Sequence, residues 1–252
     1  NMIQDAIAMI VDGRSLSSPV ASEAMREIMS GDTTDSQLGA FVTALRIKGE
    51  TVEEIAGMAQ VMREKSLHVK VDAVVADTCG TGGDGSSSFN ISTTSAFVVA
   101  GAGVLVAKHG NRAMSSNSGS ADVLEGMGIK IDLSPTSVKR CIQETGFGFM
   151  FAQRYHPSMR FAAGPRKEIG IRTVFNILGP LTNPANATAH LIGVADPIYG
   201  EVMAKVLAQL GSTRALIVHG TDGLDELSIS GETQIWEMES GSVSSYTITP
   251  ED

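Results

Sequence analysis

The glycine-rich stretch at residues 77–90, DTCGTGGDGSSSFN, constrains the fold of this chain more than any other segment. An apolar run at residues 74–76 precedes it, and a run of helical character at residues 92–100 follows it. A strand, a glycine turn and a helix N-terminus in this order can bind phosphate. Glycines let backbone N–H groups approach an anion closely, and the helix dipole favours negative charge at the same place. We therefore expect this stretch to hold a phosphate-bearing ligand.

The chain beyond residue 71 alternates short β-branched runs with helical patterns. Strands are expected at residues 74–77, 104–107, 148–152, 190–195 and 215–219, and helices at residues 92–100, 121–126, 136–144, 158–167 and 199–210. This alternation is typical of a mainly parallel, buried sheet flanked by helices. Residues 234–239 and 244–249 alternate like an antiparallel hairpin closed by Ser240 and Gly241. We expect an α/β domain over residues 71–252.

Residues 3–67 instead carry four helical patterns and no strand pattern. Apolar residues recur on one helical face in each, as with Ile3, Ile7 and Ile10. Residues 51–54, TVEE, fit a capping box, and Gly31 is placed as a stop signal. The fold class predicted for the chain is therefore α/β, with a small all-helical N-terminal domain over residues 1–70 and a larger domain with a mainly parallel central sheet.

Composition narrows the functional classes. The net charge of −9 opposes nucleic acid as the main partner, because duplex binding needs a basic footprint. Two cysteines are too few for a disulfide scaffold and suit a reducing compartment. No apolar run approaches the roughly 18 residues that a membrane span needs. We expect a cytoplasmic protein that binds neither nucleic acid nor membrane.

The pattern at residues 80–85 satisfies G-x-G-x-x-G, but its context does not fit a dinucleotide site. A dinucleotide site needs an acidic residue at the end of the next strand, where this chain has Lys108 and His109. A P-loop needs Lys after Gly85, where this chain has Ser86. Asp84 would repel a bare phosphate, which suggests sugar hydroxyls or a metal beside the anion. A glycine turn without a ligand is the competing structural explanation.

A second loop, residues 108–116, KHGNRAMSS, follows the next expected strand. In a parallel sheet the carboxyl ends of neighbouring strands open on one edge, so this loop and the glycine loop should face one crevice. The loop supplies two cations, hydroxyls and backbone amides, which suit a polyphosphate. His109 alone could equally be a hydrogen-bonded structural residue. Asn90, Ser92 and Thr93 could cap the helix, contact a ligand, or do both.

Together these passages resemble the anthranilate phosphoribosyltransferase family. The resemblance is carried by residues 80–84, 89–94, 108–112, 118–124, 170–173, 176–184 and 223–226, in colinear order over essentially the whole chain. It implies a helical N-terminal domain, an α/β domain like that of nucleoside phosphorylases, and a homodimer formed through the helical domain. It also implies that phosphoribosyl diphosphate and anthranilate are the substrates, in a step of tryptophan synthesis that uses Mg²⁺.

The resemblance also assigns residues. It places at the phosphoribosyl diphosphate site Gly80, Gly83, Asp84, Ser88, Asn90, Ile91, Ser92, Thr93, Lys108, His109, Gly110, Asn111, Arg112, Ala113, Met114, Ser115, Ser116 and Ser120. Anthranilate would meet Gly80, Asn111 and Arg166, with Arg166 pairing with its carboxylate. Mg²⁺ would be held by Ser92, Asp225 and Glu226. Lys108 and Arg112 would act in catalysis, with His109 as a candidate base.

Two departures from the family pattern stand out. Gly164 and Pro165 precede Arg166, where another apolar lead-in is expected. Family members also continue for several tens of residues past residue 252, so we expect the α/β domain to lack their closing C-terminal helices. Structural explanations remain beside the functional ones: solvated loop acids for Asp225 and Glu226, a helix-surface charge for Arg166, and a small buried residue for Cys79.

The mechanism expected is displacement at the anomeric carbon of the ribose with oxocarbenium character. The leaving group is diphosphate, so several donors that neutralise its charge should outweigh any single base. The first rival is a nucleoside phosphorylase of the same fold, which would bind phosphate and a nucleobase. The second is a non-catalytic relative that binds nucleic acid.

Overall fold

The computed structural model describes residues 1–86, 88–113 and 118–252. The chain divides into two compact units, one comprising Asn1–Ser66 with His156–Thr182 and the other Leu67–Tyr155 with Asn183–Asp252. The sequence-based division had placed residues 156–182 in the α/β domain, whereas the structure groups them with the N-terminal helices. A helical pattern predicts a helix but does not say which core the helix joins.

The helical unit is built on four N-terminal helices. These are α1 (Met2–Val11), α2 (Ser18–Ser30), α3 (Asp35–Lys48) and α4 (Val52–Glu64), and α9 (Arg160–Ile169) and the short α10 (Phe175–Leu178) come from the later segment. Thr34 and Thr51 each begin a helix with a complete capping box. Contacts join α2 to α4, α1 to α3, and α3 to α9. The helix expected at residues 158–167 is thus α9, and it belongs to this unit.

A buried carboxylate, Glu54, anchors the start of α4. It accepts hydrogen bonds from the backbone amides of Leu16 and Thr51, both at 2.8 Å. The Lys48 ammonium lies 3.0 Å from the same side chain. Because burial of an unpaired charge is costly, these three donors are what allows a fully buried carboxylate at this position.

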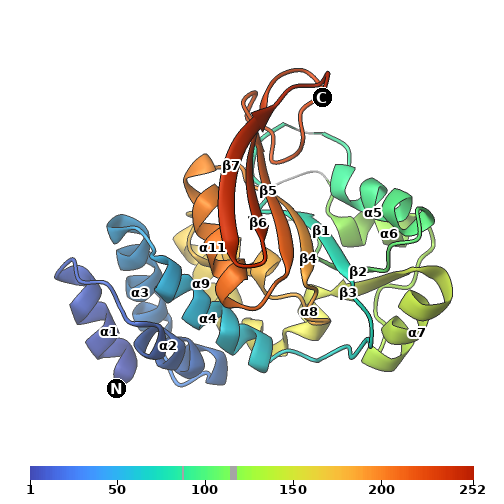
Figure 1. The fold of residues 1–252 in the computed structure, drawn as a ribbon. Coiled ribbons are helices and arrows are strands. Elements are labelled where there is room, and N and C mark those ends of the chain that lie inside the picture. Colours follow the sequence, from blue (N-terminus) through green and yellow to red (C-terminus); the bar gives the residue numbers. More distant parts are fainter. Residues whose placement is uncertain (87, 114–117) are drawn as a thin grey trace. The chain divides into compact units, whose positions relative to one another are not determined.

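The described residues of the α/β unit form a seven-stranded sheet, which Figure 1 shows with β3 at one edge and β7 at the other. The strands are β1 (Ala76–Gly80), β2 (Val106–Gly110), β3 (Phe147–Phe151), β4 (Ala189–Gly193), β5 (Arg214–Gly220), β6 (Thr233–Glu239) and β7 (Ser242–Ile248), in the order β3-β2-β1-β4-β5-β6-β7. The first five strands along the chain pair in parallel, and β6 and β7 add on in antiparallel fashion. The mainly parallel sheet and the terminal hairpin are therefore confirmed.

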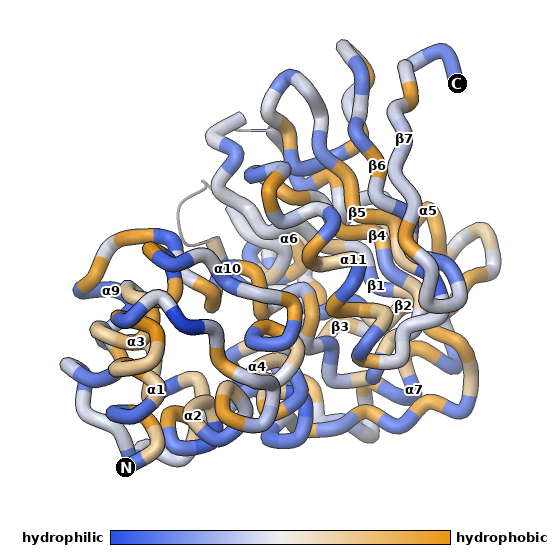
Figure 2. The backbone as a smooth tube through the Cα atoms, turned by 60° about the vertical axis from the view of Figure 1, so that its left-hand side comes forward, coloured by the Kyte–Doolittle hydropathy of each residue, from blue (hydrophilic) through white to orange (hydrophobic). Residues whose placement is uncertain are grey.

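Helices connect the parallel strands. They are α5 (Ile91–Gly101), α6 (Ser120–Gly126), α7 (Pro135–Thr145), the short α8 (Ala152–Tyr155) and α11 (Gly200–Gln209). In Figure 2 hydrophobic residues dominate β4 and β5, as expected for central parallel strands, and β7 is much paler. Strands β1 and β2 both extend further than expected, because β1 runs to Gly80 instead of residue 77 and β2 runs to Gly110 instead of residue 107. Lys108 and His109 therefore lie within β2, not in the loop after it. No helix within the described residues is both long and apolar enough to cross a membrane.

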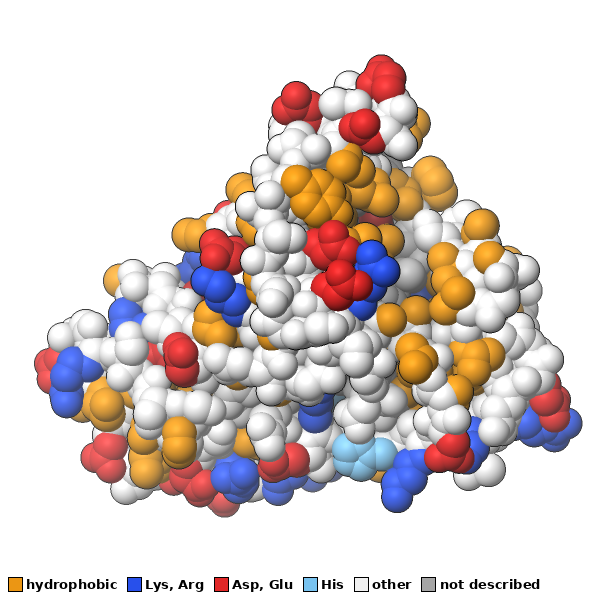
Figure 3. Space-filling view, in the orientation of Figure 1, with side chains coloured by type: hydrophobic (Ala, Val, Ile, Leu, Met, Phe, Trp, Pro, Cys, Tyr) orange, Lys and Arg blue, Asp and Glu red, His pale blue; other side chains and the backbone are white. Residues whose placement is uncertain are grey.

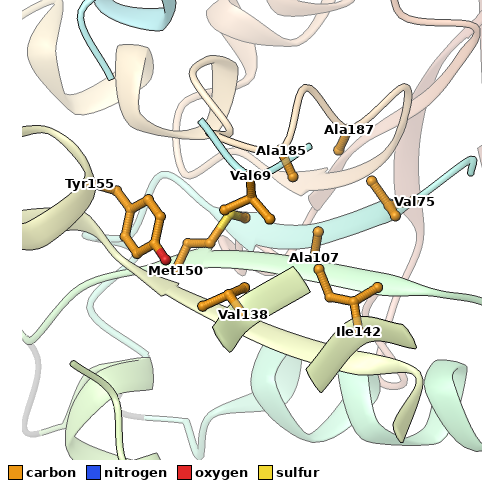
Figure 4. Close-up of a cluster of buried hydrophobic side chains, with 9 residues drawn as sticks. All are labelled: Val69, Val75, Ala107, Val138, Ile142, Met150, Tyr155, Ala185 and Ala187. Atoms are coloured by element: carbon orange, nitrogen blue, oxygen red, sulfur yellow. The ribbon is translucent and has the colours of Figure 1, made fainter. Parts of the chain in front are cut away.

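A cluster of buried side chains packs under β1, β2 and β3 (Figure 4). It contains Val69, Val75, Ala107, Val138, Ile142, Met150, Tyr155, Ala185 and Ala187. The Tyr155 hydroxyl donates to the carbonyl of Leu133 at 3.0 Å, so the one polar atom of its side chain is satisfied. This core supports the strands whose carboxyl ends carry the phosphate-binding motifs.

Ile142→Ala should lower the free energy of unfolding by about 2–5 kcal/mol, because it leaves a cavity in this cluster. Ile198→Ala is the matched control, since the Ile198 side chain is 69% exposed and Ile142 is fully buried. The control should change the free energy by no more than about 0.5 kcal/mol. Urea unfolding of both variants measures the difference, and equal losses would show that this cluster does not carry the stability of the unit.

Candidate functional site

The glycine loop leaves the carboxyl end of β1, a central strand of the sheet, and leads into α5, as predicted. Gly82, Gly83 and Gly85 adopt φ values of 66°, 80° and 70°, which favour glycine. The amide of Thr81 donates to the carbonyl of Gly193 at 2.9 Å, and the Thr81 hydroxyl accepts from the amide of Ala195 at 3.1 Å. The loop therefore begins as a continuation of the β1–β4 pairing. Its glycines then turn the backbone toward the N-terminus of α5.

Asn90 does not cap α5 through its side chain. Its amide nitrogen instead donates to the carbonyl of Ser118 at 3.2 Å. This bond joins the glycine loop to the segment after the second loop. Asn90 was one of three residues expected to cap α5. Its side chain instead links the two loops that were predicted to lie close together. Thr93 is buried, and Ser92 takes a separate role.

The two acids of the β5–β6 connection lie against the glycine loop. Asp225 Oδ2 accepts from the amide of Gly82 at 2.8 Å. Glu226 Oε1 accepts from the Ser92 hydroxyl at 2.7 Å. The structure therefore brings together the three side chains that the family resemblance assigns to Mg²⁺, although Ser92 and Asp225 are 133 positions apart in the chain. They are not solvated loop acids.

Three carboxylates, those of Asp84, Asp225 and Glu226, lie close enough here to repel one another. Burial raises the pKa of Asp225 to about 7; the Gly82 amide opposes the rise, and the charges of Asp84 and Glu226 add to it. Burial also raises the pKa of Glu226, against the effect of the Ser92 hydroxyl and of Lys108. The Asp84 carboxyl differs from these two, because hydrogen bonds with Ser86 and Asp225 lower its pKa against the effect of burial, so it stays charged beside them. A divalent cation would offset this repulsion, and carboxylate oxygens are the ligands that Mg²⁺ prefers.

These donors fit Mg²⁺ in a particular way. Mg²⁺ usually keeps several waters and takes one or two carboxylates together with phosphate oxygens of the substrate. Across residues 1–86, 88–113 and 118–252, no group of three or more His, Cys, Asp or Glu side chains is arranged to hold a metal by itself. A site completed by the Ser92 hydroxyl, water and a diphosphate agrees with both observations.

Lys108 lies under the glycine loop. Its side chain is only 2% exposed, and its ammonium donates to the carbonyl of Thr78 in β1. Burial raises the pKa of both Asp77 and Glu226, and the Lys108 charge opposes the rise in each, so it acts on both carboxyl groups. Lys108 is therefore a buried positive charge held between the end of β1 and Glu226. Nearby in β1, burial raises the pKa of the Cys79 thiol, which opposes a nucleophilic role for it.

The second loop is closed by a residue that sequence reasoning missed, Asp122. Its Oδ2 accepts from the amides of Ala113 at 2.9 Å and Gly119 at 2.8 Å, across the segment that holds the second loop. The Arg112 guanidinium lies 3.0 Å from Asp122 Oδ1 and 2.5 Å from Glu125 Oε2. The Ser120 hydroxyl donates to the carbonyl of Asn111 at 3.3 Å. Asp122 could have been suspected as the N3 residue of α6, two places after Ser120.

The remaining predicted residues are distributed as follows. Gly80 and Gly110 end β1 and β2, Ile91 opens α5, and Ser88 is exposed and accepts from the Ser86 hydroxyl at 3.1 Å. Met114, Ser115 and Ser116 lie outside the described residues.

Arg166 is part of the helical unit, unlike every other predicted site residue. It lies in α9, which continues through Gly164 and Pro165 without interruption. Its guanidinium carbon lies 5.2 Å from the centre of the Phe175 ring, and burial lowers its pKa. A half-buried guanidinium stacked on an aromatic ring is not an ordinary solvated surface charge.

Comparisons with known proteins agree with this geometry. A family model described as "Glycosyl transferase family, a/b domain" matches residues 72–252, and one described as "Glycosyl transferase family, helical bundle domain" matches residues 4–66. The anthranilate phosphoribosyltransferase of Moorella thermoacetica is 56% identical over 252 residues, which cover 100% of this chain and 74% of that protein. That of Chloroflexus aurantiacus is 57% identical over 99% of this chain and 74% of its own.

The chain belongs to the anthranilate phosphoribosyltransferase family. The anthranilate phosphoribosyltransferase of Thermus thermophilus has a similar structure, with a TM-score of 0.92 at 46% identity over 98% of this chain and 74% of that one. The Saccharomyces cerevisiae enzyme in complex with PRPP and Mg gives a TM-score of 0.90 at 30% identity, over 99% of this chain and 73% of that one. The family resemblance predicted from the motifs is confirmed. The chain spans about 74% of the anthranilate phosphoribosyltransferases that it matches.

Proposed function

We propose that this chain transfers the phosphoribosyl group of phosphoribosyl diphosphate to the amine of anthranilate, in tryptophan biosynthesis. The products are N-(5-phosphoribosyl)anthranilate and diphosphate. The observation that carries the proposal is the convergence of the loops after β1, β2 and β5, seen in the Asn90–Ser118, Gly82–Asp225 and Ser92–Glu226 hydrogen bonds. It is supported by the S. cerevisiae relative, whose structures are in complex with PRPP and Mg and with 4-fluoroanthranilate.

The residues of the α/β unit would act mainly on the diphosphate. The bond between the anomeric carbon and the diphosphate oxygen breaks, the diphosphate keeps the electron pair, and the amine nitrogen forms the new bond to carbon. Lys108 supplies a fixed positive charge, and the amides of the glycine loop supply donors. Mg²⁺, held by Ser92, Asp225 and Glu226, would neutralise part of the charge on the leaving diphosphate. The amine is neutral at pH 7 and loses its proton late, so the proposal requires no strong base, and His109 remains only a candidate.

The helical unit would contribute Arg166 and the dimer contact. Arg166 would pair with the carboxylate of anthranilate. Two apolar side chains of the helical unit are strongly exposed, Val11 at 70% and Ile47 at 81%. The homodimer through this unit is what the family resemblance implies, and light scattering would test it. A cytoplasmic location agrees with two free cysteines, Cys79 and Cys141.

The test of the reaction is the loss of anthranilate fluorescence in the presence of phosphoribosyl diphosphate and Mg²⁺. Turnover of a nucleoside with phosphate, and none of anthranilate, would favour the nucleoside phosphorylase reading instead. The face drawn in Figure 3 shows Lys and Arg interspersed with Asp and Glu, with no basic field that would suit a nucleic acid.

Arg166→Ala should raise the KM for anthranilate by about 10-fold or more, since a charge-assisted pair contributes about 1.5–3 kcal/mol. The affinity for phosphoribosyl diphosphate should stay within twofold or so, because the residue is not in the unit that holds that site. Arg160→Ala is a matched control on the same helix, with its guanidinium carbon 4.7 Å from the Phe161 ring. Steady-state kinetics with each substrate varied would measure both constants. An equal loss for the two substrates would refute the assignment.

A further inference from the structure

The strands β1 and β2 are joined near the site by side chains instead of by a backbone ladder. Their register comprises one pair, Ala76 with Val106, whereas β1 and β4 are paired from Ala76 to Gly80. Beyond Ala76, a side chain serves each of three backbone groups. Asp77 Oδ1 accepts from the amide of His109 at 3.2 Å, Asn183 donates to the carbonyl of Ala107, and Lys108 donates to the carbonyl of Thr78.

Asp77 and Asn183 form the centre of this arrangement, although 106 positions separate them in the chain. The Asn183 amide nitrogen donates to Asp77 Oδ2 at 2.7 Å and to the carbonyl of Ala107 at 2.8 Å. Asn183 Oδ1 accepts from the amide of Ala185 at 2.8 Å. Both side chains are fully buried, and both are engaged at each polar end. The Asp77–Asn183 pair thus joins β1 to β2 through hydrogen bonds, and we call it the clamp.

The Asp77 carboxylate is costly to keep in this position. Burial raises its pKa, and the Lys108 ammonium, the Asn183 amide and the His109 amide oppose the rise. A buried carboxylate with these partners contributes little stability that an apolar pair of the same volume could not supply. What an apolar pair cannot do is hold the His109 amide and attract the Lys108 ammonium at once. The arrangement therefore favours a positional role over a purely stabilising one.

We propose that Asp77 and Asn183 are positioning residues that set the conformation of β2 from Lys108 to Gly110, and so the start of the second loop, for phosphoribosyl diphosphate. The inference rests on the proposed function, because it concerns the same site. Neither residue needs to touch the substrate. Asp77 acts through the His109 amide and through the charge of Lys108, and Asn183 acts through Asp77 and the Ala107 carbonyl. Asn111 follows Gly110 directly, so its position depends on the strand conformation that the clamp sets.

Asp77→Asn is the direct test, because it keeps the shape and removes the charge. Both Asp77 oxygens are acceptors, from the His109 amide and from the Asn183 side chain. Whichever way the new Asn side chain is turned, its NH2 group would face one of these two donors, so one of the two contacts would be lost. We expect amide hydrogen exchange in residues 108–113 to become faster than in the wild type, whereas exchange in β4 and β5 should stay unchanged. We also expect the dissociation constant for phosphoribosyl diphosphate with Mg²⁺, measured by calorimetry, to rise by about 10- to 100-fold. Wild-type exchange together with wild-type affinity would overturn the proposal.

Glu54→Gln is the matched control. Glu54 is equally buried and is also held by a lysine and two backbone amides, but it lies in the helical unit. It should lower the melting temperature and leave the affinity for phosphoribosyl diphosphate unchanged. A melting temperature lowered by Asp77→Asn with unchanged affinity would reduce Asp77 to the same structural role.

Asn183→Ala provides a second route if Asp77→Asn does not fold. It leaves the Asp77–His109 contact in place and removes the hold from the other side, so we expect the same two changes to a smaller extent. Wild-type values of both would again overturn the proposal. If the wild-type chain itself does not bind phosphoribosyl diphosphate, the proposed function fails. Amide exchange at residues 108–113 then decides separately whether the clamp fixes the strand.

Discussion

Gly193→Ala should reduce kcat/KM for phosphoribosyl diphosphate by about 100-fold or more. Gly193 ends β4, and a Cβ added there would overlap the backbone carbonyl of Asp225. A carbonyl cannot rotate away as a side chain can, so the segment with Asp225 and Glu226 must shift. A displacement of about 1 Å in a positioned catalytic group can cost 10²-fold in rate.

Gly231→Ala is the control for this prediction, because it lies in the same β5–β6 connection. A Cβ at Gly231 would meet only the Thr221 hydroxyl at 3.6 Å, an ordinary contact. Its kinetics should match the wild type. Melting temperatures of both variants separate a shifted loop from an unfolded protein. Near-wild-type kcat/KM in a folded Gly193→Ala variant would show that the position of the two acids does not matter for activity.

Replacing Asp225 with Asn and Glu226 with Gln together should raise the Mg²⁺ concentration needed for half-maximal activity by about 10-fold or more. Even the loss of outer carboxylates around a metal typically costs about 10–100-fold in affinity. The same double variant should not be less stable than the wild type when Mg²⁺ is absent. The two carboxylates are largely buried beside Asp84, and their neutral isosteres remove that repulsion.

Glu232→Gln is the control for charge alone, since Glu232 is an exposed acid of the same connection. It should leave both the Mg²⁺ titration and the melting temperature unchanged. An unchanged Mg²⁺ titration in the double variant would remove Asp225 and Glu226 from the metal site. Loss of stability without Mg²⁺ would instead indicate that their hydrogen bonds to Gly82 and Ser92 outweigh the repulsion.

Much of the fold and of the site follows from local pattern. The period of the apolar residues predicted the helices and strands, and the parallel sheet then required the loops after β1 and β2 to share one edge. Partners that depend on tertiary structure were not predictable in this way. The residue type and position of Asn90 suit a helix cap, and only the folded chain shows its bond to Ser118. Asp77 reads as an ordinary strand residue until Asn183 is brought beside it.

The helix at Arg160–Ile169 illustrates the same limit for domain boundaries. Its apolar spacing predicts a helix correctly, but period alone carries no information about which of two cores receives it. Arg166 was therefore assigned to the domain that its neighbours in sequence suggested, and the structure places it in the other unit. Residues assigned by family resemblance, such as Asp225 and Glu226, were located by motif and not by any local physical signal.

The ion pairs of Arg112 bear on which anions the site can select. Its guanidinium already has two carboxylate partners, Asp122 and Glu125, on a helix that follows the loop. An incoming anion gains from Arg112 only the excess over the pairs that it replaces or shares. A ligand with several adjacent negative oxygens would compete for Arg112 better than a singly charged anion, since it can engage more than one N–H group of the guanidinium. At the proposed phosphoribosyl diphosphate site, Asp122 and Glu125 would therefore compete with any incoming anion for Arg112.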